Sequence, residues 1–212
     1  MTKYPVAEMI APHAKLIPVL HVENPDHAEP LLEALVTAGI KILEVTLRSA
    51  AGPEVIRRMK AMNSDAVIGA GTVTRPEQLK PVIDAGAVFG VSPALTPALA
   101  DAINNSGLPF LPGICTPSES LFAREQGFHE QKFFPADLFG GMNFIKHVEP
   151  LWPDVHFCPT GGISDQNSSQ YLALPTIFAV GGGFLAPKDL IDKADWKTIH
   201  ERGKASVAAA NR

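Results

Sequence analysis

The chain contains 212 residues, of which 46% are hydrophobic and 19% are charged. This apolar content is enough for a sizeable core and excludes a disordered chain, and the length favours about one domain. The formal net charge of -4 excludes the basic surface of a nucleic-acid-binding protein, and a total of 2 cysteines excludes a disulfide-rich scaffold.

The first ten residues, MTKYPVAEMI, contain no long apolar stretch of the kind found in signal peptides. No segment approaches the roughly 18 uncharged apolar residues of a membrane span. We therefore expect a cytoplasmic protein that does not bind membranes, with Cys115 and Cys158 present as reduced thiols.

Short apolar runs recur along the whole chain, each about as long as a strand and rich in Val, Ile, Leu or Phe. Strands that are apolar on both faces are typical of buried parallel sheets. The predicted strands are Leu16–Val22, Ile40–Leu47, Ala66–Gly71, Val88–Ser92, Pro109–Gly113, Gln131–Pro135, Val155–Pro159 and Ile177–Gly181.

The segments between these runs carry helix signals. After Asn24-Pro25-Asp26, apolar residues recur with the 3.6-residue period of a helix packed on one face, and Gly39 ends the segment. Other segments begin with a proline at the first helical position, where its missing N–H would have no partner. They start at Gly52-Pro53-Glu54, Arg75-Pro76-Glu77, Thr96-Pro97 and Thr116-Pro117-Ser118-Glu119, the last with Thr116 as N-cap.

Eight evenly spaced strand–helix units without a linker predict a single-domain (β/α)8 TIM barrel over residues 1–212. A short helix within residues 2–13 is expected to cover the end of the barrel where the strands begin. The alternative is an open doubly wound sheet, which the even spacing disfavours, as does the lack of a dinucleotide-type glycine turn after the first strand.

Lys132 lies within a predicted strand, directly before two phenylalanines and a proline. If its side chain points into the barrel, desolvation disfavours the ammonium form and favours a neutral amine. A neutral amine attacks a carbonyl carbon and forms a Schiff base. The alternative from the sequence alone is a lysine at the start of a strand whose amine reaches solvent.

Glu44 lies between Leu43 and Val45 on a strand of the same buried sheet, so its carboxylate needs a partner or a chemical task. It can pair with Lys132 or act as a general acid and base, and a purely structural pair is the alternative. Arg48 follows just beyond the strand, where a guanidinium can hold a substrate carboxylate or form a surface ion pair.

Glycine groups follow the last two predicted strands, at Gly161-Gly162 and at Gly181-Gly182-Gly183. The loops after strands seven and eight of such barrels often bind phosphate through backbone N–H groups, and glycine allows close approach. Two such loops favour an anion site over ordinary turns. The seven histidines show no metal-binding spacing, and we expect His129 and His156, near strand starts, to be structural or surface residues.

The chain resembles the bacterial 2-keto-3-deoxy-6-phosphogluconate (KDPG) and 4-hydroxy-2-oxoglutarate (KHG) aldolases from about Ile17 to Leu185. The motifs that carry the resemblance are Leu43-Glu44-Val45-Thr46-Leu47-Arg48, Gly69-Ala70-Gly71-Thr72-Val73, Val91-Ser92-Pro93, Pro112-Gly113-Ile114, Lys132-Phe133-Phe134-Pro135-Ala136 and Pro159-Thr160-Gly161-Gly162-Ile163-Ser164.

The resemblance implies a homotrimer and a class I mechanism on a small 2-keto acid, without metal or other cofactor. It assigns the Schiff-base lysine to Lys132 and the general acid and base to Glu44. The implied substrate-binding residues are Arg48, Thr72 and Pro93 at the keto-acid end, and Thr160, Gly161, Gly162, Gly182 and Gly183 at the other end and the phosphate.

Two positions depart from the family pattern, which commonly has Ser at position 183 and Gly at position 94; here they are Gly183 and Ala94. The first change removes a hydroxyl that would donate to the phosphate. The alternative functions are a sister aldolase for the galactonate-derived epimer and a non-catalytic sugar-phosphate-binding barrel. The presence of both Lys132 and Glu44 argues against the non-catalytic barrel.

Overall fold

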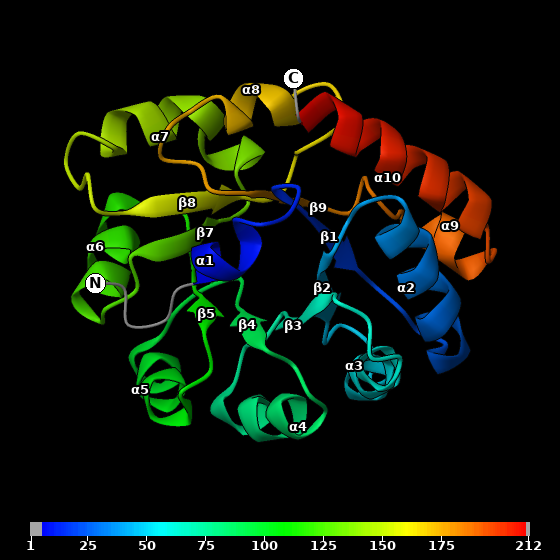
Figure 1. The fold of residues 1–212 in the computed structure, drawn as a ribbon. Helices are drawn as coiled ribbons and strands as arrows, with labels where there is room; N and C mark the ends of the chain where they lie inside the picture. Colours follow the sequence, from blue (N-terminus) through cyan, green and yellow to red (C-terminus); the bar gives the residue numbers. More distant parts are fainter. Residues whose placement is uncertain (1–5, 211–212) are drawn as a thin grey trace.

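The computed structural model describes residues 6–210, in which short strands and helices alternate along the chain (Figure 1). All paired strands run parallel. The strands are β1 (Leu16–Leu20), β2 (Ile42–Thr46), β3 (Val67–Gly71), β4 (Phe89–Val91), β5 (Phe110–Leu111), β6 (Gly113–Ile114), β7 (Glu130–Phe133), β8 (His156–Pro159) and β9 (Val180–Gly182).

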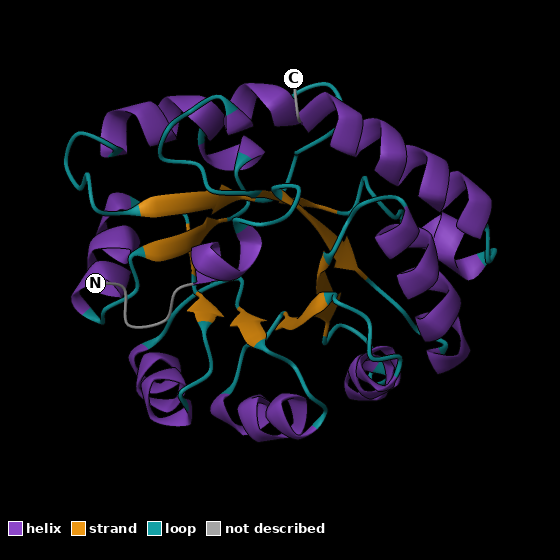
Figure 2. Cartoon of the chain, in the orientation of Figure 1, coloured by secondary structure: helices purple, strands orange, loops and turns teal. Residues whose placement is uncertain are grey.

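Most helices lie around the outside of the strands, as Figure 2 shows. They are α1 (Val6–Ile10), α2 (Ala28–Thr37), α3 (Gly52–Ala61), α4 (Leu79–Asp84), α5 (Pro97–Ser106), α6 (Pro117–Glu125), α7 (Gly141–Val148), α8 (Ser168–Leu172), α9 (Lys188–Asp192) and α10 (Trp196–Ala210). The described part of the chain also contains three short 3-10 helices, η1 (Pro25–His27), η2 (Pro76–Gln78) and η3 (Asp137–Phe139).

The strands form a curved parallel sheet in two sections. One section has six strands in the order β5-β4-β3-β2-β1-β9, and the other has three in the order β6-β7-β8. Isolated parallel bridges join Phe157 to Ile177 and Thr160 to Gly181, so the end of β8 lies beside β9. The predicted α/β fold with a parallel sheet is therefore confirmed.

The predicted helix starts agree with the structure, although two segments begin differently. Thr116 accepts a hydrogen bond from the Glu119 backbone N–H, and the Glu119 carboxylate accepts one from the Thr116 N–H, which completes a capping box. The segments after Asn24 and Arg75 begin as 3-10 turns, η1 and η2, and continue as α2 and α4.

The eight predicted apolar runs all contain strand residues, but several boundaries were wrong. The run Pro109–Gly113 contains two short strands, β5 and β6, which are separated by Pro112. Proline has no N–H to donate to a ladder, which explains the break. The run Ile177–Gly181 contributes only its last two residues, at the start of β9.

Buried side chains form two layers, one on each side of the curved sheet. The larger cluster lies between strands and outer helices, and includes Leu16, Leu20, Leu43 and Val45. A smaller cluster contains Ile17, Ile42, Phe89, Val91, Leu111 and Cys158 from the inward-facing strand positions, together with Val6 and Ile10 of α1.

The short helix α1 lies across the space that the strands surround (Figure 1). The predicted N-terminal helix is thus confirmed over Val6–Ile10, and residues 2–5 of its range lie outside the described residues. Among the helices within residues 6–210, none combines the length and the apolar character needed to cross a bilayer.

Candidate active site

Lys132 on β7 and Glu44 on β2 meet inside the curved sheet, although 88 positions separate them in the sequence. Lys132 Nζ lies 3.1 Å from Glu44 Oε1 and 3.2 Å from Oε2. The lysine side chain is 7% exposed and the glutamate side chain 4%. The alternative of a lysine reaching solvent is therefore wrong, because strand alternation turns this side chain inward.

The neighbouring strands leave room for this pair and isolate it from water. Gly71 on β3 faces Glu44, and any side chain there would overlap the carboxylate. Cys158 on β8 is the register partner of Lys132, and Gly113 on β6 is its partner on the other side. The ring of Phe134 lies 5.4 Å from Lys132 Nζ, at a distance suited to a cation–π contact with the ammonium form.

Cys158 is a second potential nucleophile near the buried amine. Complete burial raises the pKa of its thiol to about 12, so the group stays protonated at neutral pH. A buried, protonated thiol behaves as a small apolar group. Lys132 is therefore the group in this pair of strands that can attack a carbonyl.

Thr72, which directly follows β3, has a positive φ of 60°. This region is unfavourable for a β-branched residue and is often found where a binding site requires an unusual backbone. Pro93 follows β4 and is partly exposed, beside the buried Ser92. Both residues thus lie at the carboxyl ends of strands, as the sequence predicted, whereas Ala94 is exposed.

Arg48 lies just beyond β2, on the same side of the molecule as the carboxyl ends of the strands. Its Nε lies 3.3 Å from Thr46 Oγ1, and Thr46 Oγ1 in turn donates to the Leu20 carbonyl oxygen at 2.8 Å. A cleft of about 560 Å³ opens beside Arg48 and is also lined by Arg75 and Glu77, but neither Lys132 nor Glu44 lines it. The contact with Thr46 nevertheless positions the guanidinium at the end of β2, where a guanidinium can bind a carboxylate.

The loop after β8 packs closely against the loop after β7. Gly161 and Gly162 have φ values of 90° and 77°, and a side chain at position 162 would overlap Asp137. Within residues 6–210, the backbone amides of Gly161, Gly162 and Gly183 donate no hydrogen bond to another residue. These amides are consequently available to an anion.

Thr160 and Gly182 complete the set of residues predicted at this end. Thr160 is buried at the end of β8, where its side chain covers Gly181. Gly182 is buried at the end of β9, whereas Gly183 is exposed and follows it directly. The Thr160–Gly181 bridge places the residue after β8 directly beside β9, which ends at Gly182.

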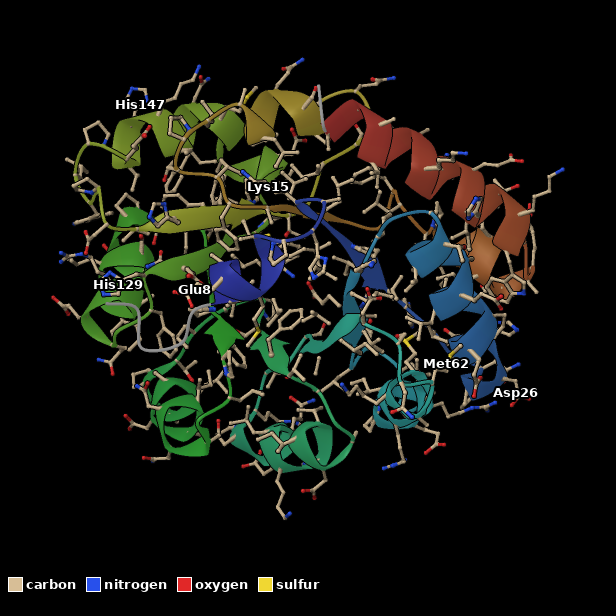
Figure 3. All side chains as sticks on the ribbon, viewed as in Figure 1. Glu8, Lys15, Asp26, Met62, His129 and His147 are labelled. Atoms are coloured by element: carbon tan, nitrogen blue, oxygen red, sulfur yellow. The ribbon has the colours of Figure 1, made fainter. Side chains whose placement is uncertain are left out.

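The histidines at the amino ends of the strands, opposite the site, form ordinary ion-pair contacts or lie at the surface. His129 Nδ1 is 3.0 Å from Asp154 Oδ2, and His156 at the start of β8 is exposed. Figure 3 places His129 and His147 at the periphery of the ribbon. Within residues 6–210, no three His, Cys, Asp or Glu side chains gather in a way that could hold a metal ion.

His21 directly follows β1 and was not among the site residues predicted from the sequence. Leu20 and Val22 face the outer helices, so His21 between them is directed toward the inner side. The signal in the sequence was a polar residue interrupting the predicted strand Leu16–Val22, in the same alternating set as Ile17 and Val19.

A buried lysine–glutamate pair at the carboxyl side of a parallel α/β sheet, with free amides and an arginine nearby, is the set of groups that a Schiff-base-forming lyase needs. The family model "KDPG and KHG aldolase" matches residues 7–202. The chain therefore belongs to the KDPG and KHG aldolase family.

Named relatives agree over nearly the whole chain. The 2-dehydro-3-deoxy-phosphogluconate aldolase of Pseudoalteromonas atlantica is 45% identical over 195 residues, covering 92% of this chain and 91% of the relative. The KHG/KDPG aldolase of Escherichia coli is 39% identical over 204 residues, covering 96% of both.

A solved structure is also similar throughout. The KDPG aldolase of Legionella pneumophila, with pyruvate captured as a covalent carbinolamine intermediate, superimposes with a TM-score of 0.90. It is 38% identical in sequence, and the match covers 94% of this chain and 96% of that one.

Proposed function

We propose that this protein is a class I aldolase that cleaves 2-dehydro-3-deoxy-6-phosphogluconate to pyruvate and glyceraldehyde 3-phosphate. Cleavage of 4-hydroxy-2-oxoglutarate to pyruvate and glyoxylate is the second reaction of the same site. The observation that carries the proposal is the buried contact between Lys132 Nζ and the Glu44 carboxylate, at 3.1 and 3.2 Å. Family membership and the named relatives support the choice of substrates.

The first half of the reaction joins the substrate to Lys132. Glu44 is close enough to accept a proton from the lysine ammonium and so release the neutral amine. The amine attacks the C2 ketone and forms a carbinolamine. Glu44 gives the proton back to the carbinolamine hydroxyl, which leaves as water, so that a cationic iminium forms and Glu44 is again a carboxylate. The iminium cation accepts the electron pair of the bond that breaks next.

The second half breaks the C3–C4 bond. Glu44, directly or through one water, removes the proton of the C4 hydroxyl, which becomes the aldehyde carbonyl as C3–C4 opens. The electron pair moves into the iminium and leaves a pyruvate enamine on Lys132. Glu44 returns a proton to C3, and water hydrolyses the iminium to pyruvate and the free amine.

The surrounding residues orient the substrate. Arg48 holds the keto-acid carboxylate and so places C2 within reach of Lys132, while Thr72 and Pro93 line that end. Thr160, Gly161, Gly162, Gly182 and Gly183 lie along the other half of the substrate, where free backbone amides bind the phosphate.

We also propose that residues 1–212 form a single catalytic domain whose two sheet sections close into one (β/α)8 barrel. The bridges between the β8 and β9 segments favour closure, and Pro112 alone separates β5 from β6. The strand order does not reverse along the sheet, unlike that of a doubly wound fold.

For the assembly we propose a cytoplasmic homotrimer. The exposed apolar side chains of Leu138, at 79%, and Phe139, at 44%, provide a surface that subunit contacts can cover. Sedimentation equilibrium should give three times the chain mass of 22.6 kDa, and a monomer mass would contradict the proposal.

The test of the proposed function is borohydride trapping with pyruvate, followed by intact-mass measurement and peptide mapping. We expect one covalent adduct, located on Lys132. The variant Lys132→Arg should fold but show neither adduct nor turnover, because a guanidinium stays protonated and cannot attack a carbonyl. An adduct that persists in this variant would remove Lys132 from its assigned role.

A further inference from the structure

His21 occupies the next inward position after Val19 along the first strand. Ile17 belongs to the inner cluster, whereas Leu16, Leu20 and Val22 belong to the outer one, so alternation continues to the residue after β1. Val19 is the register partner of Glu44 on β2. His21 therefore lies about one strand repeat beyond Glu44, at the carboxyl end of the sheet.

The first strand also borders the glycine segment after β9. Pro18 is the register partner of Gly182, and a Cβ at position 183 would lie 3.9 Å from the Val19 carbonyl oxygen. His21 thus stands between Arg48 on one side and the segment containing Gly183 on the other. In the proposed binding mode, a substrate that spans from the arginine to the free glycine amides would pass beside this imidazole.

Charged groups from three segments surround the imidazole. Its Nε2 lies 3.5 Å from Glu23 Oε1, and Lys188 Nζ of α9 lies 3.4 Å from the other oxygen of Glu23. Arg48 from the end of β2 and Asp192 from α9 complete the set of neighbours that act on it electrostatically. The imidazole itself is 22% exposed.

We propose that His21 is a specificity-determining residue that contacts the anionic group on the half of the substrate released as the aldehyde. This inference rests on the function proposed above. The ligand chemistry is an anionic oxygen, which is a phosphate in one substrate and a carboxylate in the other. Neither the proposed bond-breaking steps nor the attack by Lys132 requires this imidazole.

The protonation state of His21 couples this contact to pH. Partial burial, reinforced by the positive charge of Arg48, lowers the pKa of His21 below its usual value, so the free enzyme carries a neutral imidazole at neutral pH. Glu23 opposes this effect and favours the charged ring. A bound anion favours the charged ring further, so the substrate binds more tightly as the pH falls and the imidazole gains its proton.

The experiment compares the wild type with His21→Gln, which keeps hydrogen-bonding groups but cannot gain a proton. We expect KM for 2-dehydro-3-deoxy-6-phosphogluconate to rise by about 10-fold in the variant at about pH 6, the range for losing a charge-assisted hydrogen bond. At about pH 8 the increase should be about threefold or less, because the wild-type imidazole is then neutral. Turnover number should change little.

The same KM measurements on 4-hydroxy-2-oxoglutarate test whether His21 contacts a phosphate, a carboxylate or both. If it contacts either kind of anionic oxygen, the ratio of the variant KM to the wild-type KM should depend on pH for both substrates. The control is His156→Gln, at the exposed start of β8 and the opposite end of the strands. That variant should leave KM unchanged at both pH values.

Borohydride trapping with pyruvate distinguishes the possible failures. Pyruvate lacks the aldehyde half, so wild type and His21→Gln should form the adduct equally. Suppose that both proteins form the adduct, but the ratio of the variant KM to the wild-type KM is the same at both pH values, or kcat falls while KM does not rise. His21 then does not contact the anionic group of the substrate. If the wild type forms no adduct, both this inference and the proposed function are wrong.

Discussion

Glu44 contacts Lys132 through both carboxylate oxygens and is buried against Gly71. Glu44→Gln keeps the shape of the side chain but removes its ability to carry protons. We expect cleavage to fall by about 100-fold or more, the usual range for losing a general acid and base, while the pyruvate adduct remains detectable by borohydride trapping. Near-normal cleavage would show that another group, such as a water held by Thr72, carries the proton.

Gly183 allows the glycine segment to be tested directly. Its backbone lies outside the positive-φ region, and a Cβ there would meet only the Val19 carbonyl oxygen within 4 Å, at 3.9 Å. Gly183→Ser should therefore fold normally and supply a hydroxyl donor to the phosphate. Such a hydrogen bond predicts a decrease in KM for the phosphorylated substrate of about 3- to 100-fold.

The matched measurement for this variant uses 4-hydroxy-2-oxoglutarate, which has no phosphate. Its KM should barely change in Gly183→Ser. Equal changes in KM for both substrates would mean that position 183 affects substrate binding in general and does not contact the phosphate.

At the residue scale, part of the candidate site could be predicted from the sequence. A lysine and a glutamate inside apolar runs are costly without a partner, so their meeting followed from residue type and strand position. His21 could not be assigned in the same way, because its role depends on Arg48 and Lys188, which approach it from distant segments. Likewise, the positive φ of Thr72 is a backbone property without a sequence signal.

At the scale of elements, α1 is held in place by a buried carboxylate. Glu130 at the start of β7 is 5% exposed, and its Oε2 accepts a hydrogen bond from the Ala7 backbone N–H at 2.8 Å. Desolvation raises the pKa of Glu130 above its usual value, against the opposing effect of the backbone N–H groups of Ala7 and Val6. The ionised form is therefore less favourable in the folded than in the unfolded protein.

This shift predicts a pH dependence that the variant Glu130→Gln removes. Because the folded protein binds the proton more tightly, the contribution of Glu130 to stability is present below the ordinary glutamate pKa. It is lost as the pH rises through the raised folded-state pKa. The amide keeps an oxygen for the Ala7 N–H but cannot ionise.

Urea unfolding at about pH 4 and about pH 7 measures the effect. The free energy of unfolding of Glu130→Gln minus that of the wild type should be larger at about pH 7 than at about pH 4, because the variant gains relative stability as the pH rises. If the difference in free energy of unfolding between variant and wild type is the same at both pH values, ionisation of Glu130 does not affect the stability of the folded protein.

The positions of the strands and of the helices up to α6 were predictable from the sequence, whereas their boundaries were not. Apolar runs located the strand segments because most strand residues are buried between the inner and outer layers. The break at Pro112 and the short length of β9 depend on which backbone N–H and C=O groups form hydrogen bonds with a neighbouring strand. The hydrophobicity of single residues does not predict these hydrogen bonds. The 3-10 starts of α2 and α4 likewise follow from local backbone geometry after a proline.

At the scale of the whole molecule, the curved sheet brings together a carboxylate from β2 and an amine from β7, and the free backbone amides after β8 and β9 lie at the same side of the sheet. In the proposed mechanism these groups divide the work that aldol cleavage requires. The iminium on Lys132 would accept the electron pair, Glu44 would move the protons, and the glycine segments and Arg48 would hold the two ends of the substrate.

This division of work predicts that the reaction needs no metal ion. A metal-dependent aldolase uses a divalent cation as the Lewis acid that stabilises the enolate, whereas in the proposed mechanism the cationic iminium accepts the electron pair and becomes an enamine. Activity should therefore survive dialysis against excess EDTA, measured as pyruvate release under conditions that also support the borohydride adduct. A large loss of activity that zinc or magnesium restores, with no adduct formed before or after the metal is added, would move the electron sink from Lys132 to a metal centre and would contradict the proposed mechanism at its first step.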